Sequence, residues 1–177
     1  MQQKGHFPSG QYRGHKADIF EGGHRVPFIV QWPNKIAKAT TSDDTICLTD
    51  LMATFADISS IELKDNEAED SYSLLSIFEQ KNNSSSLREA TVQHSINGSF
   101  ALRKGEWKLI MAPGSGGWSS PTPQEIKRIS NLPPIQLYNL KKDPGETKNL
   151  EGQFPEKVSE LQAVSYTHLT LPTMFEV

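Results

Sequence analysis

The stretch TVQHSINGSFALRKGEWKLIM, residues 91–111, decides how the second half of this chain folds. Two short turns divide it, Asn97-Gly98 and Lys104-Gly105. An Asn-Gly pair readily adopts the positive φ angles that a tight hairpin turn requires. The turns therefore separate three short extended runs, and the pattern predicts a three-stranded antiparallel meander.

The residues that follow extend this sheet and add a helix. A long Gly/Ser/Pro-rich loop, residues 113–134, comes first, and residues 136–140 (QLYNL) then predict a further strand closed by the turn at residues 142–145. A last helix is predicted to begin near Pro155, because the first helical turn tolerates proline. Leu161 continues the buried face of that helix.

The residues that precede the meander lack its pattern of short strands and tight turns. Residues 1–25 are rich in glycine and histidine and indicate an extended loop. The run VPFIVQW, residues 26–32, is almost wholly apolar, which is typical of a strand buried on both faces in a parallel sheet. A single such strand cannot form a stable sheet alone, so we expect its partner strands upstream of this sequence.

A helix is predicted to follow this strand. The Thr49 hydroxyl can cap its first turn. Leu51, Phe55 and Ile58 fall at i, i+4 and i+7, so they share one face. A short helical turn is predicted in residues 71–78, before a polar linker.

Composition narrows the classes of partner. The 177 residues fit one domain of ordinary size, and the net charge of −3 provides no strong field for nucleic acid or an anionic membrane. No apolar run approaches the roughly 18 residues that a membrane span needs. The single Cys47 excludes an internal disulfide framework and a multi-cysteine metal site.

The end of the sequence differs from the rest. Residues 164–173 carry no formal charge, and the stretch resembles translated sequencing-adapter DNA. We therefore expect residues 165–177 to be a non-native tail; the alternative is a natural C-terminal strand.

Three blocks of sequence carry a family resemblance. The first, residues 12–29 (YRGHKADIFEGGHRVPFI), is similar to a block of the arylsulfatase family that runs into a Trp-Pro pair, here Trp32-Pro33. The second, residues 102–110 (LRKGEWKLI), resembles the family's C-terminal hairpin, and the third, residues 137–150, resembles its final block. The blocks occur in the family's order, so the chain resembles the C-terminal part of a type I, formylglycine-dependent sulfatase.

This resemblance implies an α/β fold: the C-terminal part of an alkaline-phosphatase-like fold, in residues 1–86, followed by a small antiparallel sheet packed with a helix, in residues 87–164. It implies hydrolysis of sulfate esters of a glycan or aryl substrate by a protein that is exported, being periplasmic, secreted or lysosomal. It also implies a formylglycine nucleophile and calcium in the full-length enzyme. The C/S-x-P-x-R motif is absent, since Cys47 is followed by LTDL. The calcium ligands of the family are expected upstream, so we expect this chain to be inactive alone.

The resemblance assigns the catalytic role to Lys16, which falls on the family's sulfate-contacting lysine. An ammonium fixed near the anionic oxygens of a sulfate ester stabilises the charge that develops in the transition state. Lysine supplies a compact point charge where a flat arginine fork is not required. The alternative is a solvated surface lysine, the usual state of this residue type.

Four more residues are candidates for substrate binding. His15 and His24 can hydrogen-bond a sulfate or a sugar hydroxyl, and His94 precedes the Asn-Gly hairpin turn. Trp118 lies in the glycine-rich loop and can stack on a sugar or aryl face. The alternative for this loop is a surface segment without function.

The remaining polar residues of the first block are expected to be structural. The spacing of nine residues between His6, His15 and His24 matches neither a helical pair nor a zinc finger, so no metal site is predicted. The glycines of Glu21-Gly22-Gly23 permit close backbone turns. Arg25 can pair with Glu21 or Asp18.

Two other functions stay open from the sequence. One is a phosphate or phosphonate ester hydrolase of the same superfamily. The other is a non-catalytic carbohydrate-binding module built on the antiparallel sheet.

Overall fold

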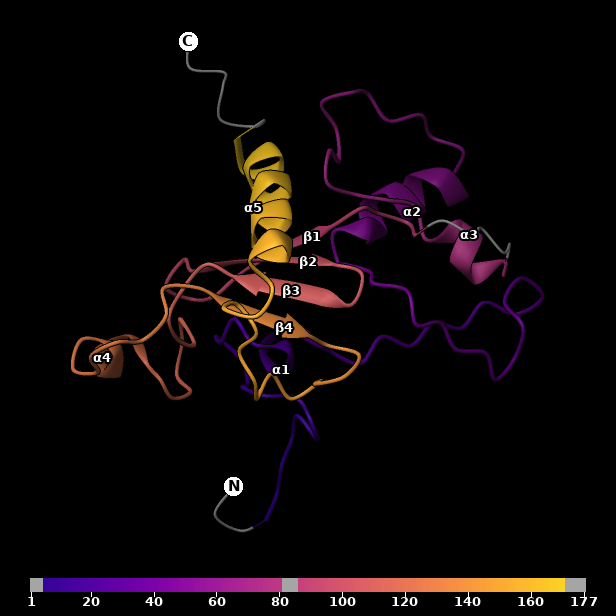
Figure 1. The fold of residues 1–177 in the computed structure, drawn as a ribbon. Helices are drawn as coiled ribbons and strands as arrows, with labels where there is room; N and C mark the ends of the chain where they lie inside the picture. Colours follow the sequence, from indigo (N-terminus) through magenta and orange to yellow (C-terminus); the bar gives the residue numbers. More distant parts are fainter. Residues whose placement is uncertain (1–4, 81–85, 171–177) are drawn as a thin grey trace. The chain divides into compact units, whose positions relative to one another are not determined.

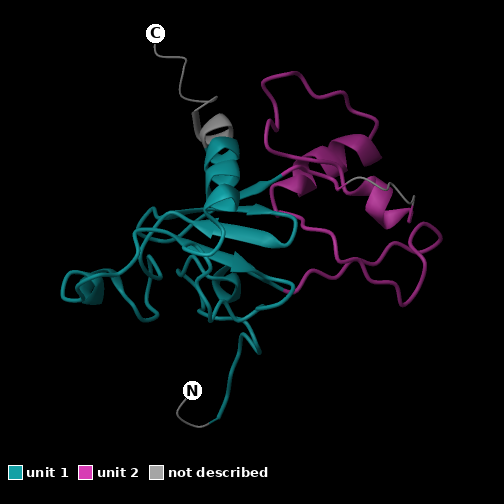
Figure 2. Ribbon diagram, viewed as in Figure 1, with its two compact units in different colours: residues 1–26, 90–177 teal, residues 27–89 magenta. Residues whose placement is uncertain are grey.

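The computed structural model describes residues 5–80 and 86–170, with side chains through Ser165. Contacts divide the chain into two units, residues 1–26 together with 90–177, and residues 27–89 (Figure 2). The predicted boundary near residue 86, between the α/β part of the family's fold and its C-terminal subdomain, refers to the full-length enzyme and stays a prediction.

The first unit contains one four-stranded antiparallel sheet. Its strands follow the chain in the order β1 (Thr91–His94), β2 (Phe100–Lys104), β3 (Trp107–Ile110) and β4 (Gln136–Asn139) (Figure 1). The predicted meander and the predicted fourth strand are both confirmed. The register places Val92 opposite Leu102, Leu102 opposite Leu109, and Leu109 opposite Leu137, so one apolar row crosses the whole sheet.

Helix α5 (Pro155–Thr170) packs on this apolar row, and it begins at the proline that the sequence indicated. Val158 and Leu161 join the leucines of the row in one buried cluster. Burial of each large aliphatic side chain stabilises the fold by roughly 1.5–3 kcal/mol.

The opposite face of the sheet is covered by the N-terminal segment, which includes α1 (Glu21–His24). Ile19 and Phe20 form a second buried cluster with Ala101, Ile110 and Tyr138. Both faces of the sheet are therefore buried, and all four residues of β4 are buried.

Two glycines let the N-terminal segment fold tightly on itself. A Cβ atom on Gly22 would lie 2.4 Å from the carbonyl oxygen of Gly14, and one on Gly23 would lie 2.2 Å from that of Asp18. No side chain fits at these separations. The predicted structural role of this pair therefore rests on close approach of the backbone.

A short helix, α4 (Pro123–Ile126), lies inside the predicted loop after β3. It is closed by a capping box, in which the Thr122 hydroxyl accepts from the Glu125 backbone and the Glu125 carboxylate accepts from the Thr122 backbone.

The second unit contains α2 (Asp50–Ile58) and α3 (Leu75–Phe78), and both helices were predicted. Thr49 is the N-cap residue of α2, but its hydroxyl makes no capping bond. The carboxylate of Asp50 instead accepts the Cys47 amide at 2.7 Å.

The buried side of α2 is polar. The Asp50 carboxylate binds Arg88 and the backbone N–H of Tyr72, and the Thr54 hydroxyl accepts the backbone N–H of Leu74 at 2.9 Å. Phe55, on the apolar face that the sequence identified, is exposed.

The predicted strand at residues 26–32 is wrong for the described structure. The segment has no strand assignment, and Val26, Phe28, Ile29 and Val30 are exposed, with 92% of Ile29 accessible. A strand requires hydrogen-bond partners for its backbone N–H and C=O groups. None of the described residues forms a strand beside this segment. An apolar run alone therefore did not decide the local structure.

The prediction of a non-native tail over residues 165–177 lies mostly outside the described residues; α5 continues to Thr170. Within the described parts of the chain, every helix is too short or too polar to cross a membrane.

Candidate functional site

A cavity of about 820 Å³ opens between the N-terminal loop and the loop that follows β3. Its lining comes from residues between Phe7 and His15 and from residues 118–120. The structure thus brings together His15 and Trp118, whose ring centroids are 6.3 Å apart. Both residues were predicted to bind substrate, and 58% of Trp118 is accessible.

The carboxylate of Asp18 joins the two segments that line the cavity. One oxygen accepts the backbone N–H groups of Trp118 and Ser119 at 2.7 and 2.9 Å. The other accepts the backbone N–H of His15 at 2.8 Å and the Ser119 hydroxyl at 2.5 Å. Burial alone would raise the pKa of Asp18, but the hydrogen bonds from Ser119, His15 and Trp118 together lower it.

From the sequence, Asp18 was predicted only as a possible ion-pair partner of Arg25. Asp18 and the loop that it binds lie far apart in the sequence, since Ser119 is 101 residues from Asp18. No local pattern indicates such a bond, so the sequence could not identify this residue as the link between the two loops.

Lys16 lies in the turn between His15 and Asp18, and it is exposed. The turn is held on both sides: the Asp18 amide donates to the His15 carbonyl at 3.0 Å, and the Ile96 amide donates to the Ala17 carbonyl at 3.0 Å. Ala17 has a φ of 87°, which side-chain-bearing residues rarely adopt. Among the described residues, none forms a hydrogen bond or ion pair with the Lys16 ammonium, so this charge is available to an external anion.

A buried ion network is centred on Lys108 and Glu21. Lys108 of β3 is fully buried, and its ammonium lies 3.0 Å from Glu21 and 3.2 Å from Glu146. Glu21 also pairs with Arg25 at 2.8 Å, as predicted, and with Arg103 at 3.3 Å. The network ties α1, the sheet and the turn after β4 together.

The pKa values of the two carboxyl groups in this network shift in opposite directions. Burial opposes ionisation of Glu21, but the charges of Lys108 and Arg103 outweigh it and lower the pKa. Burial dominates at Glu146 and raises its pKa, although Lys108 acts in the opposite direction. Because Lys108 and the carboxyl groups are buried and face one another, we assign the network a structural role.

Arg13 lines the cavity, but its guanidinium is already engaged. It donates to the carbonyl oxygens of Glu146 and Ser120, at 3.0 and 3.3 Å, and lies 3.9 Å from the centre of the Phe20 ring. Arg13 therefore shapes the cavity wall and is not a free anion ligand.

The other two predicted histidines do not line this cavity. His24 is half-buried on α1, and its Nε2 atom is buried without a hydrogen-bond partner. His94 is exposed at the end of β1, where its Nδ1 atom lies 3.1 Å from the Ser95 carbonyl. Desolvation, together with the nearby charge of Lys108, lowers the pKa of His24 to about 4, so this ring is neutral at pH 7.

The titration of His24 predicts a loss of stability in acid. Its folded pKa of about 4 lies below the ordinary histidine pKa of 6.5, so the unfolded chain binds the proton first as pH falls. Stability is therefore lost as pH decreases from 6.5 to 4, by about 2 kcal/mol for a half-buried ring. His24→Leu is expected to reduce the slope in this window, measured by urea unfolding at several pH values. Equal slopes in the two proteins would contradict this account.

The described residues contain no group of three or more His, Cys, Asp or Glu side chains that could hold a metal ion. The calcium that the family resemblance implies therefore has no fitting ligand set in the described part of the chain.

Comparison with known proteins gives a consistent result. The sequence pattern of the family "N-sulphoglucosamine sulphohydrolase, C-terminal" matches residues 13–114. The chain is 36% identical over 160 residues to N-acetylgalactosamine-6-O-sulfatase of Bacteroides thetaiotaomicron, which covers 89% of this chain and 30% of that protein. It is 31% identical over 170 residues to human arylsulfatase A, with coverage of 91% and 33%. The chain thus spans about a third of the length of these relatives.

Solved structures share the fold. One, from work on the metabolism of multiple glycosaminoglycans by Bacteroides thetaiotaomicron, has a TM-score of 0.76 and 32% identity, and the match covers 96% of this chain and 34% of that one. The crystal structure of Ps i-CgsB in complex with k-i-k-neocarrahexaose has a TM-score of 0.66 at 20% identity, which shows the fold alone; the match covers 91% of this chain and 32% of that one.

Proposed function

Because this chain belongs to the sulfatase family, in which it corresponds to the C-terminal region, we propose that its protein hydrolyses sulfate esters and that the cavity beside Lys16 receives the substrate. The observation that carries the proposal is that His15 and the exposed Trp118 line one cavity, and that Lys16, which directly follows His15, has no partner among the described residues.

Each of these residues has a distinct task. The Lys16 ammonium binds the anionic oxygens of the ester and stabilises the additional charge on the leaving oxygen as the S–O bond breaks. The Trp118 ring offers a flat apolar face to the sugar or aryl group. The His15 ring forms a hydrogen bond with the bound substrate. His24 and His94 do not line the cavity, and we propose that they contact a longer substrate outside it.

The chain itself lacks the groups that begin the reaction. The sequence contains no C/S-x-P-x-R motif, and the described residues offer no calcium site. We therefore propose that the nucleophile and the metal are supplied by the remainder of a full-length enzyme, and that this chain contributes charge stabilisation and substrate contacts.

The substrate class is proposed to be a sulfated glycan. Two observations support it: one relative is named as an N-acetylgalactosamine-6-O-sulfatase, and a related structure comes from work on glycosaminoglycan metabolism. An open cavity with an exposed tryptophan suits a sugar ring. From the family resemblance we also propose that the protein is exported, to the periplasm, the medium or a lysosome.

The purified 177-residue chain is expected to release no sulfate from aryl or glycan sulfate esters, because it lacks the nucleophile. The measurement is sulfate release by ion chromatography, with material from cells that carry the empty vector as the control. Sustained turnover by the purified chain, free of host enzyme, would contradict the assignment of the nucleophile to another part of the enzyme.

Trp118→Ala in the full-length enzyme is expected to raise KM for a sulfated sugar by about 3- to 10-fold, because one aromatic contact contributes about 1 kcal/mol. Trp32→Ala is the matched control, since Trp32 belongs to the second unit and does not line the cavity. An unchanged KM in Trp118→Ala would remove this residue from the substrate site.

A further inference from the structure

Three side chains at the cavity form a continuous hydrogen-bonded row. The Ser119 hydroxyl lies 2.5 Å from one oxygen of Asp18 and 3.1 Å from Nδ1 of His15. The direct separation between His15 Nδ1 and the Asp18 carboxylate is longer, 3.5 Å. Ser119 is therefore the link between the buried carboxylate and the histidine ring.

The direction of each proton in this row follows from counting donors. The ionised Asp18 carboxylate can only accept, and it already accepts three backbone N–H groups, one from His15 and two from the Trp118 loop. The Ser119 hydroxyl has a single proton, which it donates to Asp18. The lone pairs of its oxygen then remain for His15, so Nδ1 of His15 must be the donor.

A neutral imidazole carries one N–H, so a proton on Nδ1 leaves a lone pair on Nε2. His15 lines the cavity, and 44% of its side chain is accessible. No described residue hydrogen-bonds Nε2, the nitrogen on the side of the ring away from Ser119. The ring thus offers an acceptor to a ligand in the cavity.

We propose that Asp18 and Ser119 are positioning residues that fix His15 as the Nδ1–H tautomer, so that Nε2 accepts a hydrogen bond from a hydroxyl or amide N–H of the bound sugar. This inference rests on the proposed function, and it adds a specificity rule to it. The ammonium of Lys16 attracts the anionic sulfate, whereas the Nε2 lone pair of the Nδ1–H tautomer of His15 repels an anion's lone pairs and selects a donor group. The ligand class is therefore a sulfated sugar with a free donor group near the ring that stacks on Trp118.

The first experiment measures the tautomer without any ligand. Long-range ¹H–¹⁵N NMR spectra of the 177-residue chain at a pH where imidazole is neutral distinguish a protonated Nδ1 from a protonated Nε2, and His15→Gln assigns the signal by its absence. We expect the proton on Nδ1. A proton on Nε2 in the wild-type chain would overturn the proposal.

Two variants test the source of this preference. In Asp18→Asn the amide donates to the Ser119 oxygen, so the hydroxyl proton turns toward His15 and the tautomer is expected to switch to Nε2–H. If that variant does not fold, Ser119→Ala removes the link while Asp18 keeps its three backbone donors, and the Nε2–H fraction is expected to increase. A tautomer unchanged in every folded variant would overturn the role of Asp18 and Ser119.

The second experiment tests recognition. The affinity of N-acetylgalactosamine 6-sulfate is compared with that of its monodeoxy analogues, by chemical-shift titration of the wild type and of His15→Phe. Loss of the contacted hydroxyl is expected to weaken wild-type binding about 5- to 10-fold and to leave His15→Phe unaffected. If both proteins give the same analogue series, the recognition by His15 is overturned. If the tautomer is Nδ1–H but no sulfated sugar binds even to the full-length enzyme, the proposed function fails instead.

Discussion

Replacing Lys108 with methionine is expected to lower the free energy of unfolding by about 3–5 kcal/mol, because the change leaves two buried carboxyl groups without the cation between them. Glu21 and Glu146 both lie within 3.2 Å of the Lys108 ammonium, and all three side chains are at least 99% buried. Methionine fills a similar volume, so the loss reports the charge and not a cavity.

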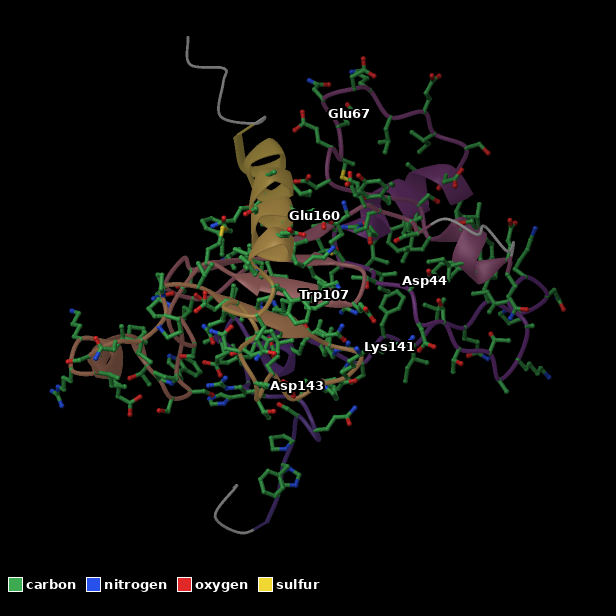
Figure 3. The ribbon with its side chains drawn as sticks, in the orientation of Figure 1. Asp44, Glu67, Trp107, Lys141, Asp143 and Glu160 are labelled. Atoms are coloured by element: carbon green, nitrogen blue, oxygen red, sulfur yellow. The ribbon has the colours of Figure 1, made fainter. Side chains whose placement is uncertain are left out.

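Urea unfolding at pH 7 measures this change. Lys141→Met is the matched control, because Lys141 is exposed on the segment after β4 (Figure 3) and is expected to change stability by no more than about 0.5 kcal/mol. The double variant Lys108→Met with Glu146→Gln should recover part of the loss, since it removes the Glu146 carboxyl group, whereas Glu21 keeps its ion pairs with Arg25 and Arg103. A Lys108→Met protein as stable as the wild type would refute the structural role of the network.

Replacing Lys16 with alanine in the full-length enzyme is expected to lower kcat by about 10²- to 10³-fold, the usual effect of removing one preorganised group that stabilises transition-state charge. The stability of the protein is expected to stay within about 0.5 kcal/mol of the wild type, because Lys16 is exposed and binds no described residue. A large loss of activity with an unchanged unfolding curve separates a catalytic role from a structural one.

Two controls sharpen this experiment. Lys142→Ala removes an exposed lysine of the turn after β4 whose sequence neighbours, unlike His15 beside Lys16, do not line the cavity, and it is expected to keep wild-type kcat. Lys16→Arg keeps the positive charge but changes its shape, and we expect intermediate activity. If Lys16→Ala retained wild-type kcat, Lys16 would be a solvated surface residue.

The sheet could be predicted from the sequence because its turns are determined locally. Gly98 and Gly105 have φ angles of +81° and +57°, so each predicted turn uses a glycine in the left-handed region, although Asn97 does not share it and residues 95–99 together connect β1 to β2. Once these turns are fixed, the strands between them and their register follow. Helix α5 could likewise be located from Pro155 and the apolar residues that follow it.

The rest of the site depends on contacts between distant segments. Lys108 lies in a strand between Trp107 and Leu109, where alternation predicts a solvent-facing side chain, yet α1 and the turn at Glu146 enclose it. Asp18 and Ser119 likewise meet only after the two loops fold together. The strand predicted at residues 26–32 failed for a related reason: apolar composition cannot supply a pairing partner.

The candidate site residues could be named from the sequence, but their arrangement in space could not. The family resemblance identified Lys16, and the chemistry of the side chains identified His15 and Trp118 as candidate ligands. The sequence could not show that the two rings share one cavity, because this depends on the bonds that Asp18 makes to both loops.

The most direct test of the central claim is a crystal structure of the full-length enzyme, with an inactivated nucleophile, in complex with a sulfated sugar. The claim predicts a sulfate oxygen within hydrogen-bond distance of the Lys16 ammonium and the sugar ring against Trp118. A sulfate held elsewhere, with the Lys16 ammonium directed into bulk solvent, would contradict it.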